Sequence, residues 1–103
     1  QENGLDEAIA VLRQGIQKFP HPHLYNALSE ALQKQENGLD EAIAVLRQGI
    51  HKFPNDDRVY MTLSEYLLSR ENGLDEAIAV LRQGIQKIPN PKLYVALSQA
   101  LQK

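Results

Sequence analysis

The sequence contains the segment ENGLDEAIAVLRQGI three times without a change, at residues 2–16, 36–50 and 71–85. Successive copies start 34 residues apart (Glu2 to Glu36) and then 35 residues apart (Glu36 to Glu71). A repeat period of about 20–50 residues indicates an architecture in which similar units stack on one another. We therefore predict one repeat domain over residues 1–103, with units at 1–34, 35–69 and 70–103.

Each unit is predicted to form two helices. Apolar residues at i, i+3, i+4 and i+7 indicate a helix from Leu5 to Lys18, and Asn3 followed by Asp6 resembles a capping box at its start. A polar residue followed by Pro22 or Pro91 predicts the start of a second helix. The core stripes of the second helices are Tyr25, Leu28, Ser29 and Leu32, then Tyr60, Leu63, Ser64 and Leu67, then Tyr94, Leu97, Ser98 and Leu101. No stretch of useful length alternates between apolar and polar residues, as a β-strand would, so the fold class is predicted to be all-α.

The composition of the chain argues against two classes of binding partner. The chain has 103 residues, no cysteine and a net charge of −2. The net negative charge argues against nucleic acid as a partner, because such binding relies on a basic surface. Apolar runs are only a few residues long, so no membrane partner is expected, and we take the cytoplasm as the default location.

The two helices together resemble the tetratricopeptide repeat (TPR), a 34-residue helix-turn-helix unit. The first complete match is formed by Tyr25, Leu28, Ser29, Leu32, Ala42, Leu46, Gly49 and Pro54. The second is formed by Tyr60, Leu63, Ser64, Leu67, Ala77, Leu81, Gly84 and Pro89. Two features depart from the family pattern: the turn Gln-Glu-Asn-Gly is one residue longer, and glycine replaces the usual alanine in the second helix. We interpret these glycines as sites of close helix packing, since glycine costs a helix about 1 kcal/mol relative to alanine. The alternative is that the glycine was copied with the segment without a packing requirement at each site.

The resemblance implies an α-solenoid of three helical hairpins that curls into a right-handed superhelix. It also implies that the helices containing the identical segment lie on the outer side, while the variable helices line a concave groove that binds peptides. The expected function is thus a non-enzymatic scaffold for protein–protein interaction, with a protein or peptide ligand as partner.

The candidate groove residues lie beside the core stripe of the variable helices. They are Asn26, Glu30, Arg58, Met61, Glu65, Leu68, Lys92, Val95 and Gln99. Met61, Leu68 and Val95 form an apolar spot with a charged rim, which suits a helix or an extended peptide. The alternative interpretation is that these residues only pack neighbouring helices together. Because Glu30 and Glu65 would repel a carboxylate, the acidic chaperone tails bound by some family members are not expected as ligands.

Neither metal binding nor catalysis is expected. His21, His23 and His51 correspond to Asn, Lys and Gln in other copies, so no converging set of metal ligands recurs. Paired acids at the helix starts are explained by the helix dipole, and no serine has an evident base. We therefore predict no metal site, no cofactor and no enzymatic activity.

Two other functions compete with peptide binding. The runs Tyr-Asn-Ala-Leu and Asp-Glu-Ala also resemble the pentatricopeptide repeat, an RNA reader, but the helix spacing and net charge disfavour that interpretation. The second competitor is a self-assembling homo-oligomer whose copies associate head to tail or by exchanging terminal helices, because the first and last helices lack the polar caps that repeat arrays need. Its expected contact residues are Leu5, Ile9, Leu12, Tyr94, Leu97 and Leu101. Threefold identity over fifteen residues is typical of recent duplication or of deliberate engineering.

Overall fold

The computed structural model describes residues 2–103, with side chains from Gly4 onward. It contains six helices and, within these residues, no strand. The helices are α1 (Glu2–Lys18), α2 (Pro22–Gln33), α3 (Leu39–Lys52), α4 (Asp57–Leu68), α5 (Leu74–Lys87) and α6 (Pro91–Leu101). The prediction of an all-α chain is thus confirmed for the described residues.

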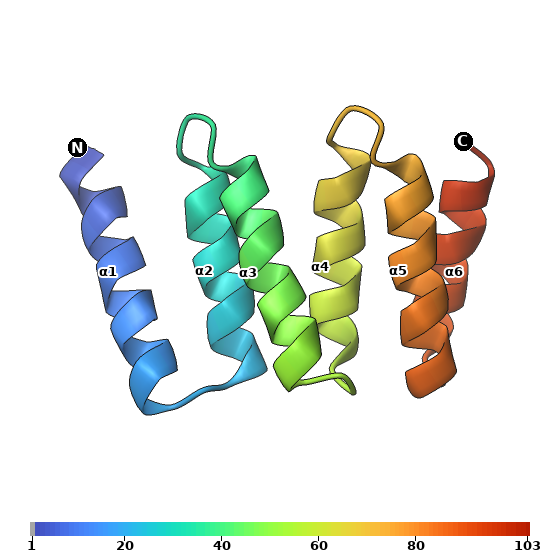
Figure 1. Ribbon diagram of the computed structural model, residues 1–103, viewed down its shortest axis with the longest axis horizontal. Helices are drawn as coiled ribbons and strands as arrows, with labels where there is room; N and C mark the ends of the chain where they lie inside the picture. The colour runs from blue at the N-terminus through green and yellow to red at the C-terminus, as the bar shows by residue number, and fades with distance from the viewer. Residues whose placement is uncertain (1) are drawn as a thin grey trace.

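The six helices lie side by side in chain order, and the turns that join them alternate between the two ends of the molecule (Figure 1). Each helix packs against its neighbours in sequence, and α4 also contacts α2 and α6. By contrast, within the described residues no Cα atom of α3 comes within 8 Å of α1 or α5. The even-numbered helices are therefore packed more closely than the odd-numbered ones.

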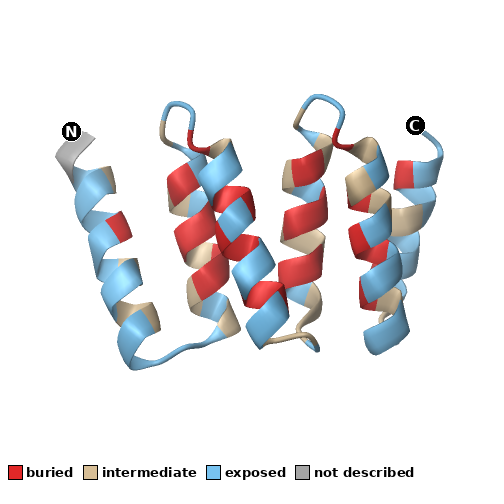
Figure 2. Cartoon of the chain, viewed as in Figure 1, coloured by how far each residue is buried: buried red, intermediate tan, exposed pale blue. Residues whose placement is uncertain are grey.

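The core lies in the middle of the row, as Figure 2 shows by the concentration of buried residues in α2 to α5. Its largest fully enclosed side chains include Tyr60, Leu32, Leu46 and Leu81. Helices α1 and α6 each pack against one sequence neighbour only, so each leaves one side open. The middle helices α2 to α5 are thus covered on both sides, and the end helices α1 and α6 on one side only.

The predicted starts of the second helices are confirmed. The imidazole of His21 accepts a hydrogen bond from the backbone N–H of His23 at 3.0 Å, and Asn90 caps α6 in the same way at 2.8 Å. In α4 the carboxylate of Asp56 accepts from the N–H of Val59 at 3.1 Å. A side-chain acceptor of this kind satisfies one of the free donors in the first turn.

The predicted capping box does not form in the second and third copies. There α3 and α5 start after Gly38 and Gly73, which make no side-chain cap, while Asn37 and Asn72 adopt left-handed backbone angles with φ of 60° and 63°. The side chain of Asn3 lies outside the described residues. Asparagine tolerates this conformation better than most residues, and it allows the chain to turn back from the preceding helix.

The same letters that form these turns are helical in the first copy, where α1 already begins at Glu2. A Cβ atom on Gly38 would lie 1.9 Å from the carbonyl oxygen of Leu32, whereas one on Gly4 would meet nothing within 4 Å. No helix precedes α1 within the described residues, so nothing forces residues 2–4 to turn. The predicted start at Leu5 is therefore correct for the equivalent positions 39 and 74, but not for the first copy.

The helix glycines confirm close packing at two positions. A Cβ on Gly84 would lie 3.0 Å from Cγ of Tyr60, and one on Gly49 would lie 3.1 Å from Val59 and 3.3 Å from Tyr25. At Gly15 the nearest atom is the end of a leucine side chain at 3.4 Å, which is an ordinary contact. The glycine is therefore needed where two helices enclose it and is dispensable at the open end.

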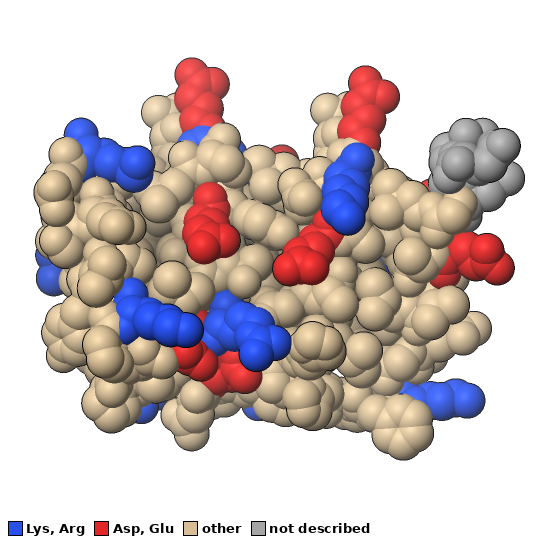
Figure 3. Space-filling view, turned by 180° about the vertical axis from the view of Figure 1, so that it is seen from behind, with Lys and Arg blue, Asp and Glu red and all other residues tan. Residues whose placement is uncertain are grey.

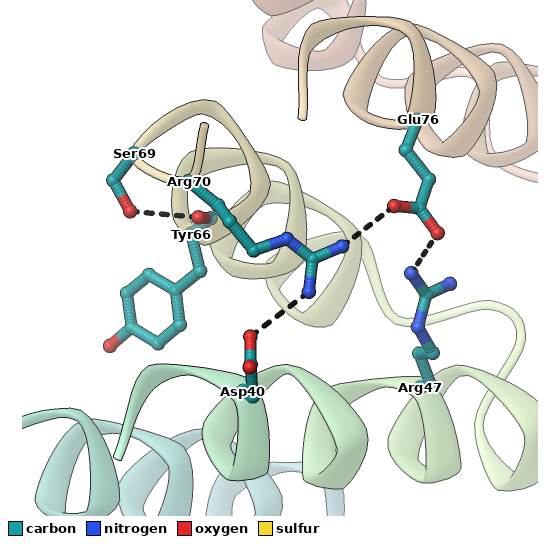
Figure 4. Close-up of polar contacts among 6 residues, drawn as sticks. All are labelled: Asp40, Arg47, Tyr66, Ser69, Arg70 and Glu76. Atoms are coloured by element: carbon teal, nitrogen blue, oxygen red, sulfur yellow. Dashed lines mark hydrogen bonds and ion pairs between the residues drawn. The ribbon is translucent and has the colours of Figure 1, made fainter. Parts of the chain in front are cut away.

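Charged side chains bridge the gaps between the odd-numbered helices. Arg13 of α1 pairs with Glu41 of α3 at 2.7 Å, and Arg47 of α3 pairs with Glu76 of α5. Arg70, from the turn before α5, pairs with both Asp40 (3.1 Å) and Glu76 (2.9 Å). Figure 4 shows these residues together. Exposed pairs of this kind contribute only about 0–1 kcal/mol each, so they set the register between helices more than the stability.

No helix among the described residues has the length and the apolar character needed to cross a membrane.

Candidate functional site

The groove between α4 and α6 is the candidate site. It holds two adjoining cavities of about 360 and 290 Å³ that share Met61, Ala96 and Gln99. The first continues along Ser64, Glu65, Leu68, Leu81 and Lys103. The second continues along Pro91, Lys92 and Val95. Six of the nine predicted groove residues thus come together in one continuous surface.

Helical spacing explains this convergence. Met61, Glu65 and Leu68 stand at i, i+4 and i+7 on α4, and Val95 and Gln99 stand at i and i+4 on α6, so each set lies along one side of its helix. The two helices contact each other, which brings the sets face to face.

The floor of the groove is apolar and its rim is charged. Met61 and Leu68 are half-buried and also pack on the main core cluster, while Val95 is 56% exposed. Both interpretations of these residues therefore apply: two of them pack the helices together and still present a surface. Glu65 and Lys92 are exposed at the edges of the two cavities.

Three of the predicted groove residues lie elsewhere. Asn26 corresponds to Met61 and Val95 but is only 4% exposed, and neither its amide nitrogen nor its oxygen has a hydrogen-bond partner. Arg58 reaches toward α2, where its guanidinium lies 3.1 Å from Nδ1 of His23. Glu30 is exposed on α2 and lines neither cavity of the groove. Helical spacing correctly shows that these residues occupy positions equivalent to, or beside, the groove residues. They nevertheless lie near the contact between α2 and α4, away from the groove between α4 and α6.

Tyr66 on α4 was missed by sequence reasoning. Burial raises the pKa of its hydroxyl, a hydrogen bond with Ser29 lowers it, and the carboxylates of Glu30 and Glu65 raise it. The two predicted groove acids therefore act on one point between α2 and α4. One signal was available: Tyr66 replaces the alanine found at the equivalent positions 31 and 100.

Tyr60 has a structural role. Its ring is fully enclosed, its hydroxyl donates to the carbonyl of Pro54 at 2.8 Å, and burial raises its pKa.

Two larger cavities lie between the odd-numbered helices, with volumes of about 410 and 420 Å³. They are lined by equivalent residues of successive copies, for example Arg13 and Arg47, Ile16 and Ile50, and Val45 and Val80. They arise wherever one copy of the identical segment follows another, because the odd-numbered helices stand apart. Sequence reasoning did not anticipate them.

The predicted self-association residues differ in exposure. Ile9 is 7% exposed and packs in a cluster with α2, so it is covered within the chain. Leu5, Leu12 and Leu97 are half-buried. Tyr94 and Leu101 are 56% and 53% exposed. Val11 and Phe19, which sequence reasoning did not select, are more exposed than any of them, at 59% and 72%.

Among the side chains that the structure describes, from Gly4 onward, no three or more metal-ligating groups form a cluster. His21 caps α2, and the hydroxyls of Ser29 and Ser64 each donate to a backbone carbonyl one turn earlier at 2.8 Å. Acidic and basic side chains are interspersed on the face shown in Figure 3, and no extended basic patch is visible there.

No protein-family model matches the chain, and no match to it was found among curated proteins.

Proposed function

We propose that the chain is a non-enzymatic protein–protein interaction scaffold of the tetratricopeptide type. In this proposal its helices form three hairpins of a right-handed α-solenoid, and a peptide or helix binds on the side formed by α2, α4 and α6. The closer packing of the even-numbered helices supports this assignment, because it makes their side concave. The residue pattern from Tyr25 to Pro89 supports the family.

One observation carries the choice of site: the lining of the groove cavities includes residues that differ between copies. Position 61 is methionine where its equivalents are Asn26 and Val95, and position 68 is leucine where its equivalents are Gln33 and Gln102. The cavities between the odd-numbered helices repeat almost unchanged from copy to copy. A surface that recognises one ligand needs such local differences, whereas a repeated gap follows from stacking alone.

The size and chemistry of the groove define the ligand class. At about 290 and 360 Å³, the cavities are near the lower limit of small-molecule pockets, which hold about 300–1,000 Å³. Each cavity suits one or two side chains of a longer peptide. Met61, Leu68 and Val95 favour an apolar anchor, with Glu65 available to a basic neighbour and Lys92 to an acidic one.

A selection of peptides tests this function. A random peptide library displayed on phage is selected on the wild-type chain, and the enriched peptides are synthesised and titrated by fluorescence anisotropy. We expect Val95→Lys to weaken binding at least tenfold, because it places a charge in the apolar part of the groove. Gln86→Lys is the matched control: it adds the same charge at an exposed position of α5, away from the groove.

The outcomes separate clearly. If both substitutions weakened binding equally, or if neither weakened it, the peptide would bind outside the groove. Failure to enrich any peptide over unselected phage would overturn the proposed function itself.

A further inference from the structure

All five large hydrophobic side chains that the structure exposes among the described residues lie at the two ends of the row, and four of them lie outside the groove. Val11 and Phe19 belong to the first outer helix and the residue that follows it, and Tyr94 and Leu101 belong to α6. Only Val95 faces the groove described above. Exposed apolar residues gathered on two separate surfaces of one small chain indicate two interaction surfaces.

The middle of the chain shows how the same residues are covered when a neighbour is present. Val45, which corresponds to Val11, is 7% exposed. Tyr25 and Leu32, which correspond to Tyr94 and Leu101, are 3% and 1% exposed. The exposure at the ends therefore results from a missing neighbour and not from a different sequence.

The α2–α3 interface is the intact version of the contact that both ends lack. Phe53 stands edge-on to the ring of Tyr25, with centroids 5.9 Å apart and an interplanar angle of 63°. Phe19 is the copy of Phe53, and Tyr94 is the copy of Tyr25. Each therefore presents one half of an aromatic pair that the chain completes elsewhere.

The two end helices are close copies of the two helices of that interface. From Leu5 to Lys18, α1 differs from α3 only in having Gln17 in place of His51. From Pro91 to Leu101, α6 differs from α2 only at Lys92, Val95 and Gln99. The open side of α6 is therefore equivalent to the side of α2 that receives α3, and the open side of α1 is equivalent to the side of α3 that packs on α2.

We propose that the open side of α1 binds the open side of α6 in a second copy of this chain, in the register of the α2–α3 interface. Phe19 of one copy then stands against Tyr94 of the other. Gly15 takes the place of Gly49, whose Cβ position lies 3.3 Å from Tyr25, and so allows the Tyr94 ring to approach its helix.

Charge supports the same register independently. Arg13 pairs with Glu41, and Arg47 pairs with Glu76, so each odd-numbered helix is linked to the next. The following arginine in this series is Arg82 of α5 and the first glutamate is Glu7 of α1; both are exposed. When α1 of a second copy follows α6, Glu7 of that copy takes the position next to Arg82 and continues the series.

This contact is heterologous, because each copy uses two different surfaces. One copy that binds through α6 still has a free α1, so association continues head to tail unless it closes into a ring. The average mass of the wild-type chain is therefore expected to rise with concentration above the 11.6 kDa of one copy. A two-fold dimer, in contrast, would stop at twice that mass.

Two blocked variants test the proposal. Phe19→Lys blocks only the α1 side and Tyr94→Lys blocks only the α6 side; both residues are more than half exposed, so each variant keeps its fold. We expect each variant alone to remain monomeric in sedimentation velocity at concentrations where the wild type associates. Mixed in equal amounts they should form a heterodimer, because each retains the surface that the other lacks. Gln48→Lys is the matched control: it adds the same charge at an exposed position of α3, away from both ends, and should associate like the wild type.

The register has its own test. Arg82→Glu should weaken association of the wild-type chain by about two- to fivefold, which corresponds to an exposed ion pair. Adding Glu7→Arg to the same chain should restore it. A wild-type chain that stays at 11.6 kDa over a hundredfold concentration range would overturn the proposal, as would a blocked variant that dimerises alone.

Discussion

The first and second copies of the identical segment show how differently one sequence behaves in two places. In α3, which packs between α2 and α4, Ala42 and Leu46 are both 0% exposed. In α1, which packs on α2 alone, Ala8 is exposed and Leu12 is half-buried. Because the residues are the same, the difference comes from the neighbours. The stability that a side chain contributes therefore depends on its place in the array.

The largest expected effect compares Leu46→Ala with Leu12→Ala. Removing a fully buried leucine costs about 2–5 kcal/mol, because the lost transfer energy and the remaining cavity add together. Leu12 is already partly in water and leaves no closed cavity, so its loss should cost less than half as much. Urea unfolding followed by circular dichroism, at a concentration where the chain is monomeric, measures both values. Equal losses would mean that α1 is as well covered as α3.

The next comparison concerns Gly38 and its equivalent in the first copy, Gly4. Gly38→Ala places a Cβ against the carbonyl of Leu32 and should destabilise the chain by about 1–3 kcal/mol, as overpacking does. Gly4→Ala meets no atom within 4 Å and lies within α1, so it should stabilise the helix by up to about 1 kcal/mol. Thermal unfolding should therefore show shifts of opposite sign. Two shifts in the same direction would indicate that residues 2–4 form a turn in solution as residues 36–38 do.

Helices α2 and α6 offer a matching comparison between Asn26 and Val95. Asn26→Met removes two buried polar atoms that have no partner, and methionine already occupies the equivalent position 61. We expect a gain of about 1–3 kcal/mol, the usual cost of an unsatisfied buried group. Val95→Asn places asparagine at the equivalent position of α6. Because Val95 is exposed, this substitution should change stability by no more than about 0.5 kcal/mol. If Asn26→Met proved neutral in urea unfolding, the amide would have a partner in solution.

The smallest expected effect distinguishes the helix glycines. Gly15→Ala should gain up to about 1 kcal/mol of helix propensity, because the added methyl group meets only the flexible end of Leu24. Gly84→Ala should show no gain, since its methyl group would press on the ring of Tyr60. A differential melting experiment on the two single variants measures the difference. A gain at both positions would mean that glycine was copied into the third unit without a packing requirement.

Sequence reasoning predicted the six helices, the capped starts of α2 and α6, and six residues of the groove. It placed Asn26 and Arg58 in the groove as well, because helical spacing shows which residues share one side of a helix. Spacing does not show how deeply a neighbouring helix covers that side. Tyr66 was overlooked for the same reason, since its contact with α2 depends on how two helices pack.

Helix positions in this protein follow from interactions within a few residues of the chain: apolar spacing, a capping side chain, a proline at the first turn. The sequence alone determined those, and it made all three copies alike. Only the tertiary structure decided that Val45 is buried and Val11 exposed, that residues 36–38 turn and residues 2–4 do not, and that Gly84 is confined and Gly15 is free. Burial requires a second surface, and the same fifteen residues meet a different number of neighbouring helices in each copy.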